Sequence, residues 1–180
     1  KMINALILAT EFNQLLPIEQ RPEFTDHYEG FYHLTKLSGS VEEAQIEYIV
    51  RDHNRDKFED KKKLMEQSVD FLKKKYPSAI IKLDMQDQYY NMREKVEPVY
   101  YAVEIAEQAM KEENIEVEIK PIRGGTDGAR LSYMGLPCPN IFAGGHNFHG
   151  KFEYVPVESM EKAVNVIVRI AGLYTALREV

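Results

Sequence analysis

The sequence predicts an α/β protein with two layered parts, and two observations support this prediction. The first half has the order helix, strand, strand, helix, strand, which is a βαββαβ sandwich of the ferredoxin-like type without its first strand. The second half alternates helices with strands, which is typical of an α/β layer arrangement. The pattern changes near residues 88–97, so we divide the chain into residues 1–90 and residues 91–180.

The first half begins with a helix and a pair of strands. The helix is expected to run from Asn4, as its N-cap, to about Leu16, because apolar residues recur at helical spacing before Pro17. Residues 31–37 suit a strand. In residues 46–51 apolar and polar side chains alternate, which predicts a half-buried strand antiparallel to the first.

A long helix and a further strand complete the first half. The helix is expected at about residues 56–75, with Asp52 or Asn54 as its cap. Pro77 closes this helix, and the alternating residues 81–85 then predict another strand. We expect the two helices of this half to cover one face of an antiparallel sheet.

The second half begins with a helix at residues 99–112 and a strand at residues 115–122. A glycine-rich loop and a short helix follow, and residues 140–144 predict a short strand. The last helix is expected from about Val157. Its apolar stripe is predicted to consist of Met160, Val164, Ile167, Ala171 and Tyr174.

The composition excludes several classes of protein. The net charge is −6 at pH 7 and the lysines form no basic face, so we expect no binding to nucleic acid. No apolar run approaches the ~20 residues of a membrane span, so no membrane partner is expected. Cys138 is the only cysteine, which excludes an intrachain disulfide and favours a reducing compartment, so we expect a cytoplasmic protein.

The loop from Arg123 to Gly128 is the first candidate site. It joins a predicted strand to a predicted helix, and its glycines allow backbone N–H groups to face a cleft. Arg123 adds a bidentate donor that suits a carboxylate. The structural alternative is a tight turn, with Asp127 as an N-cap and Arg123 in a surface ion pair. A P-loop is excluded, because no Lys-Ser or Lys-Thr follows the last glycine.

A second loop, residues 144–150, carries two histidines and is followed by Glu153. A neutral imidazole in a loop after a strand is well placed to bind zinc, and His146 and His149 are three residues apart. The alternative is that both are surface or hydrogen-bonded residues.

Arg51 ends the second predicted strand and is a third candidate, with a salt bridge at the sheet edge as its structural alternative. The remaining histidines are interpreted as structural. They are His27, His33 and His53.

Six stretches carry a family resemblance. They are Tyr-Glu-Gly-Phe-Tyr-His-Leu at 28–34, Ile-Val-Arg-Asp-His-Asn-Arg at 49–55, Tyr-Tyr-Asn-Met-Arg-Glu-Lys at 89–95, Arg-Gly-Gly-Thr-Asp-Gly-Ala at 123–129, Met-Gly-Leu-Pro-Cys-Pro-Asn at 134–140 and Gly-Gly-x-Asn-x-His-Gly-Lys at 144–151. They resemble the C-terminal part of the peptidase T family, aminotripeptidases of the zinc-dependent exopeptidase and aminoacylase superfamily. The resemblance covers essentially the whole chain.

This resemblance implies a fold and an activity. Members of the superfamily have a two-zinc catalytic domain with an inserted ferredoxin-like lid, which often mediates dimerisation. Residues 1–90 would then be the lid without its first strand, and residues 91–180 the C-terminal part of the catalytic domain. The intact enzyme would remove the N-terminal residue from short peptides, chiefly tripeptides, by means of metal-activated water, and would form a homodimer through the lid.

The resemblance also assigns roles to single residues. His149 corresponds to a histidine that binds one of the two zinc ions, whereas His146 stands where the family pattern has a tyrosine. Arg51 and Arg123 match arginines that hold carboxylate and carbonyl oxygens of the peptide. The other zinc ligands and the glutamate that acts as general base are expected before Lys1. The chain by itself is therefore expected to contain no general base and to be inactive.

An alternative from another class is a free-standing ferredoxin-like module that serves in binding or dimerisation. Such a module has no need for an arginine and a histidine on loops at strand ends, whereas a metallopeptidase does. An open reading frame that continues upstream into zinc-binding motifs would favour the peptidase.

Overall fold

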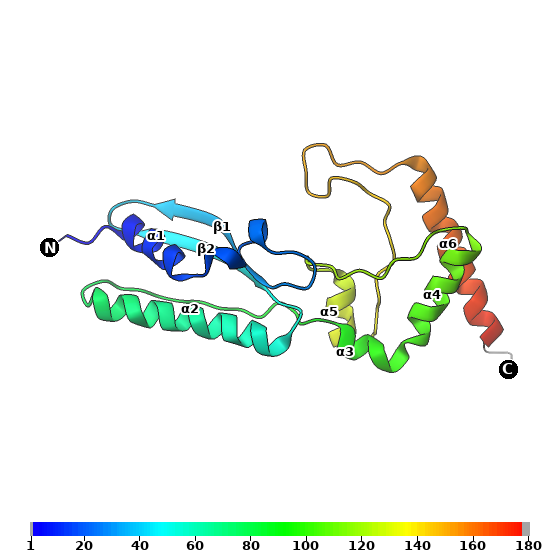
Figure 1. The fold of residues 1–180 in the computed structure, drawn as a ribbon, viewed down its shortest axis with the longest axis horizontal. Helices are drawn as coiled ribbons and strands as arrows, with labels where there is room; N and C mark the ends of the chain where they lie inside the picture. The colour runs from blue at the N-terminus through cyan, green and yellow to red at the C-terminus, as the bar shows by residue number, and fades with distance from the viewer. Residues whose placement is uncertain (1, 178–180) are drawn as a thin grey trace. The chain divides into compact units, whose positions relative to one another are not determined.

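The structure, a computed structural model, describes residues 2–177. The chain is an α/β protein, and its only sheet among these residues has two strands (Figure 1). It divides into two compact units. The first contains Lys1–Asn91 together with Pro121–Gly124, and the second contains Met92–Lys120 together with Gly125–Val180.

The helices of the first unit begin at the caps that the sequence predicts. The elements of this unit are α1 (Ala5–Leu15), η1 (Ile18–Gln20), η2 (Pro22–Phe24), β1 (Phe31–Gly39), β2 (Ala44–Arg51) and α2 (Arg55–Lys75). The side-chain oxygen of Asn4 accepts a hydrogen bond from the backbone N–H of Leu6 at 3.0 Å, and Asn54 accepts one from Lys57 at 2.9 Å. Asn54, rather than Asp52, is therefore the cap of α2.

Strands β1 and β2 form the predicted antiparallel hairpin. Its register runs from Phe31 opposite Arg51 to Gly39 opposite Ala44. The turn requires glycine, because Gly39 has a φ of +147° and a Cβ atom there would lie 2.2 Å from the carbonyl oxygen of Glu43.

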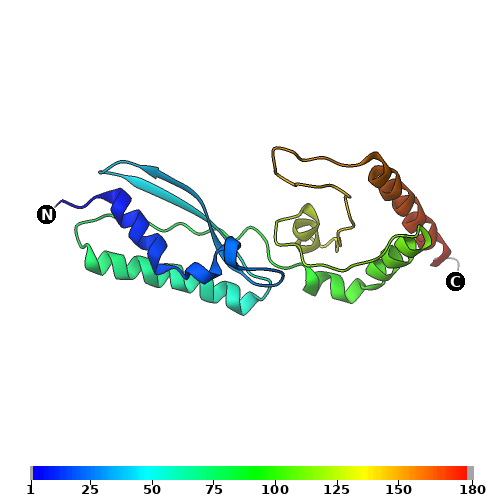
Figure 2. The same cartoon turned by 45° about the horizontal axis from the view of Figure 1, so that its top comes forward.

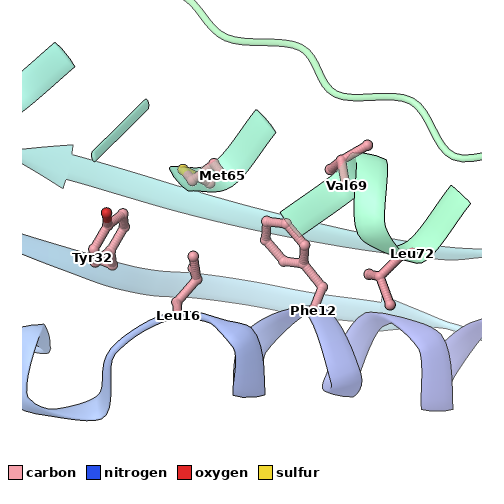
Figure 3. Close-up of a cluster of buried hydrophobic side chains, with 6 residues drawn as sticks. All are labelled: Phe12, Leu16, Tyr32, Met65, Val69 and Leu72. Carbon is pink, nitrogen blue, oxygen red and sulfur yellow. The ribbon is translucent and has the colours of Figure 1, made fainter. Parts of the chain in front are cut away.

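The core of the first unit lies between this hairpin and the two helices. Its buried residues are Phe12, Leu16, Tyr32, Met65, Val69 and Leu72. In Figure 3 the side chains of Phe12 and Leu16 point toward the side chains of α2. Alternate residues of β2, namely Ile46, Tyr48 and Val50, pack against this cluster, so both helices cover the same face of the hairpin, as predicted. Burial of each large apolar side chain stabilises the fold by about 1.5–3 kcal/mol.

The second unit consists of helices and connecting segments. Its helices are α3 (Arg93–Val96), η3 (Glu97–Val99), α4 (Tyr101–Glu112), α5 (Asp127–Tyr133) and α6 (Val157–Leu177). Helices α4 and α6 pack against each other and lie side by side in both views (Figure 1 and Figure 2). The side-chain hydroxyl of Thr126, not Asp127, caps α5 by accepting from the backbone N–H of Ala129 at 3.2 Å. None of the helices between residues 2 and 177 is long and apolar enough to cross a membrane.

The apolar stripe predicted for α6 is wrong in part. Met160, Val164 and Ile167 are exposed, whereas Val166 is buried. Helix α6 carries apolar residues on more than one face, so spacing alone does not select the face that packs. Contact with α4 makes that selection.

Three strand predictions are also wrong. Residues 81–85, 115–122 and 140–144 are not strands in the structure. A strand exists only where a neighbouring strand completes its hydrogen-bond ladder, and no segment within residues 2–177 pairs with these three. Ile81 and Leu83 nevertheless pack against the core of the first unit. The sheet is thus reduced to one hairpin, and the ferredoxin-like arrangement stays a prediction.

Replacement of Leu72 by alanine tests the importance of this core. Leu72 is 0% exposed, so the variant should lose about 2–5 kcal/mol of unfolding free energy through lost contacts and the cavity that remains. Urea unfolding followed by circular dichroism measures the loss. Ile80, which is 90% exposed in the same unit, is the control, and Ile80→Ala should unfold at nearly the wild-type urea concentration. Equal effects of the two substitutions would contradict the assignment of the core.

Candidate functional site

Arg51 is held at the end of β2 by contacts that leave its charge without an acidic partner. Its Nη2 donates to the side-chain oxygen of Gln88 at 3.1 Å, and its Nη1 donates to the carbonyl oxygen of Val50 at 3.2 Å. The guanidinium carbon lies 4.8 Å from the centre of the Tyr89 ring, a cation–π contact. Burial raises the pKa of Tyr89, so this phenol stays neutral beside the guanidinium.

Arg123 lies in the segment Pro121–Gly124, which belongs to the first unit. Its Nη1 donates to the carbonyl oxygen of Thr25 at 2.6 Å, and its Nη2 donates to the Thr25 hydroxyl at 2.5 Å. The guanidinium carbon lies 4.8 Å from the centre of the Phe31 ring. The Nε atom is buried and has no hydrogen-bond partner among the described residues. The surface ion pair considered as an alternative is absent from the described part of the chain.

The hairpin register brings the two arginines to the same strand end. Phe31 is the cross-strand partner of Arg51, and the guanidinium of Arg123 lies over the same Phe31 ring. Within residues 2–177 neither arginine pairs with a carboxylate. Two unneutralised guanidinium groups at one strand end favour an anionic or carbonyl-bearing ligand.

A buried ion pair fixes the chain directly after Arg51. The Asp52 and Lys61 side chains are only 2% and 10% exposed, and Lys61 Nζ lies 3.1 Å from Asp52 Oδ2. Asp52 Oδ1 also accepts from the backbone N–H of Asn54 at 2.9 Å. A Cβ atom on Gly30 would lie 2.1 Å from Asp52 Oδ2, so glycine is required where this carboxylate meets the backbone. Because Lys61 neutralises Asp52, the carboxylate that follows Arg51 in the chain does not compete for it.

His53 follows this pair and is half-buried, with its ring edge-on to Tyr28 at 5.3 Å between centres. Burial lowers the pKa of His53, and the charge of Arg123 lowers it further, while Asp52 and a backbone hydrogen bond oppose the shift. His53 therefore favours its neutral form in the folded protein. His27 is exposed with its Nε2 3.4 Å from Asp26, and His33 lies edge-on to Phe31.

The second unit carries the predicted histidine loop on its surface. His149 is exposed with φ +63°, and its backbone N–H donates to Glu153 Oε2 at 2.9 Å. His146 stacks on the Tyr154 ring at 4.9 Å, and the two backbones form an isolated antiparallel bridge. The exposed imidazole of His149 is a donor of the kind that zinc accepts.

Between residues 2 and 177 no three His, Cys, Asp or Glu side chains gather as a metal-binding group. A structural or catalytic zinc site uses three or four protein ligands. The described residues therefore do not form a complete zinc site by themselves.

Some residues of the site were not anticipated from the sequence. Thr25 is 98 positions from Arg123, and neither periodicity nor motif spacing connects the two. Tyr89 and Phe31 lie within the stretches that carry the family resemblance, but their contacts with the arginines arise only from folding. The burial of Lys61 against Asp52 is likewise not indicated by the sequence.

Comparison with known proteins gives consistent results. The sequence profile described as Peptidase family M20/M25/M40 matches residues 23–172. Proteins named Peptidase T are 56% identical in Clostridium acetobutylicum, over 97% of this chain and 43% of that protein, and 59% identical in Bacillus cereus strain ATCC 10987, over 95% and 42%. The chain thus spans less than half the length of these relatives.

A solved structure is also similar. It is a tripeptidase from Staphylococcus aureus subsp. aureus Mu50, with a TM-score of 0.60 and 13% sequence identity, over 93% of this chain and 44% of that one. At this identity the likeness concerns the fold alone.

The lowered pKa of His53 predicts a pH-dependent part of stability. Because the folded-state pKa lies below the ordinary histidine pKa of about 6.5, the unfolded chain takes up the proton first as the pH falls. Stability from neutral His53 is therefore present above about pH 6.5 and is lost as the pH falls through 6.5 toward the folded-state pKa. Urea unfolding of wild type and His53→Gln at pH 8 and pH 5 should show a larger loss for the wild type. A smaller loss in the wild type, or an NMR titration midpoint at or above 6.5, would contradict the argument.

Proposed function

The chain belongs to peptidase family M20/M25/M40, and from this we propose that it is the C-terminal part of a zinc-dependent aminotripeptidase. Such an enzyme removes the N-terminal residue from short peptides, chiefly tripeptides. The observation that carries the proposal is the similarity to proteins named Peptidase T over nearly the whole chain. The family match runs through both compact units, so a free-standing binding module is not favoured.

Arg51 and Arg123 recognise the peptide in this proposal. Arg51 is the cross-strand partner of Phe31, the guanidinium of Arg123 lies over the Phe31 ring, and both arginines lack acidic partners among the described residues. A guanidinium binds both oxygens of a carboxylate at once, which a lysine ammonium does not do in the same planar geometry. The two residues would hold the carboxylate and the carbonyl oxygens of the substrate.

His149 supplies one zinc ligand in this proposal. Its imidazole is exposed on the loop, and the Glu153 carboxylate holds the His149 backbone rather than the ring. Zinc, when bound, lowers the pKa of a water molecule to about 7 and so makes it a nucleophile for the peptide carbonyl. The remaining ligands and the general base would come from other parts of the enzyme, so we propose that residues 1–180 alone are inactive.

Residues 1–90 are proposed to act as a lid that also forms a homodimer. The β1–β2 hairpin carries exposed apolar side chains, which are Leu34, Leu37 and Ile49. Within the described residues the outer edges of both strands lack a ladder partner, so a second copy would satisfy them and cover these side chains. We propose the cytoplasm as the location, in keeping with the single cysteine.

Replacement of Arg123 by lysine tests peptide recognition. In the complete enzyme Arg123→Lys keeps the charge but loses the bidentate fork, so kcat/KM for a tripeptide should fall about tenfold or more while the melting temperature changes little. Arg51→Lys should act in the same direction. Steady-state kinetics and thermal unfolding of the same preparations measure both quantities.

Arg169 provides the matched control, because its guanidinium binds Glu112, the last residue of α4, at 3.2 Å and Glu113, the C-cap of this helix, at 3.0 Å. Arg169→Lys should leave the kinetics unchanged. A large drop in melting temperature with normal kinetics for Arg123→Lys would show that Arg123 has only a structural role.

Replacement of His149 by alanine tests the zinc ligand. In the complete enzyme His149→Ala should lose bound zinc, measured by plasma mass spectrometry, and lose tripeptide hydrolysis, because one ligand is removed. His146→Ala is the control on the same loop and should retain both. Residues 1–180 alone, dialysed with zinc, should retain little metal and hydrolyse nothing. Stoichiometric zinc in this isolated chain would refute the placement of the other ligands outside it.

A further inference from the structure

We propose that Thr25 is a positioning residue for peptide recognition: its two oxygen atoms hold the Arg123 guanidinium in the orientation that meets the peptide carboxylate. This inference rests on the proposed role of Arg123. The contacts from which it is argued join residues 98 positions apart in the sequence.

Thr25 binds both ends of the guanidinium. Its carbonyl oxygen accepts from Arg123 Nη1 at 2.6 Å, and its hydroxyl oxygen accepts from Nη2 at 2.5 Å. These distances are at or below the lower end of the range for hydrogen bonds in which one partner is charged, which are the stronger kind. A single residue thereby fixes both the direction and the plane of the Arg123 head group.

The Thr25 hydroxyl is itself oriented by a third contact. It donates its hydrogen to the carbonyl oxygen of Arg21 at 3.0 Å. With the hydrogen directed there, the lone pairs of Oγ1 are left to accept from Arg123. Serine can make both contacts, whereas valine has the same shape as threonine and can make neither.

The other surroundings of Arg123 limit where a ligand can bind. A guanidinium has five N–H hydrogens. One on each Nη faces Thr25, and the Nε atom is buried. The second hydrogen on each Nη has no partner within the described residues. These two hydrogens point to opposite sides of the head group, so each can donate to a separate oxygen of a peptide. The Phe31 ring lies against one face of the guanidinium plane.

The same contacts set Arg123 relative to Arg51. Thr25 follows η2, which packs against β1, and β1 begins at Phe31 opposite Arg51. The side chain of Arg123 is thus ordered by folding, and its loss of rotamer freedom does not oppose substrate binding. Removal of the Thr25 hydroxyl should return part of that freedom and weaken the binding of a carboxylate.

The experiment compares a tripeptide with its C-terminal amide as substrates of the complete enzyme. Thr25→Val should raise KM for the tripeptide about three- to tenfold with kcat within about twofold, since one charge-assisted hydrogen bond is lost. The ratio of KM for the amide to KM for the acid measures the preference for the free carboxylate, and this ratio should fall. Thr25→Ser should restore wild-type values, and Thr25→Ala, a second variant without the hydroxyl, should behave as Thr25→Val does.

Thr35 offers the matched control, because its hydroxyl donates to the carbonyl oxygen of Glu47 at 3.2 Å on the exposed part of the hairpin. Thr35→Val should keep the wild-type KM and the wild-type preference. An unchanged acid-to-amide preference in both hydroxyl-free variants of Thr25, with or without a lower melting temperature, overturns the inference. A lower KM in Thr25→Val also overturns it, because Thr25 would then compete with the substrate.

The same kinetic measurements distinguish a wrong proposed function from a wrong role for Thr25. If Arg123→Lys has wild-type kinetics, or the complete enzyme hydrolyses no tripeptide, the proposed function is wrong. If Arg123→Lys is impaired and the hydroxyl-free variants of Thr25 are normal, only the positioning role is wrong.

Discussion

The antiparallel pairing of β1 with β2 is the constraint on which the arrangement of the first unit depends. Because side chains alternate along a strand, a shift of one residue would turn every side chain to the other face. The observed register turns Ile46, Tyr48 and Val50 toward α1 and α2 and closes the core. The same register sets Phe31 opposite Arg51, so the core and the candidate site depend on one set of ladder hydrogen bonds.

Charge is distributed at the end of this hairpin so that the arginines stay available. The carboxylate of Asp52, which follows Arg51 in the chain, is buried against Lys61, and Lys61 also lies over the Tyr32 ring of the core. Burial raises the pKa of Tyr32 to about 12, so this phenol remains neutral and does not add a negative charge. Removal of one member of such a buried pair would leave an uncompensated charge, which makes the pair a structural requirement at the base of the site.

The second unit is organised by the packing of helices. Helices α4 and α6 pack together, while the segments between the helices keep apolar side chains at the surface, among them Ile119, Met134 and Phe152. Apolar side chains that alternate along a segment predict a strand only if a neighbouring strand is present, which explains why the alternation at residues 115–122 was misleading. The histidine loop, by contrast, depends on local contacts, since the backbones of His146 and Tyr154 pair with each other.

The sequence by itself determined the features that arise from neighbours along the chain. The cap Asn4 and the helix that follows it are set by residues within a few positions, and the sequence limits the cap of α2 to Asp52 or Asn54. The family was likewise evident in short contiguous stretches, which include the loops of Arg123 and His149.

Only the tertiary structure decided what depends on partners far apart in sequence. Within residues 2–177, residues 81–85 and 115–122 have no strand partner in the folded structure. Lys61, which looks like a surface residue in the sequence, is buried. It also joined Thr25 to Arg123 across 98 positions. The physical reason is the same in each case: hydrogen-bond ladders, buried ion pairs and shared donors require a second group, and the position of that group is set by the packing of the whole unit.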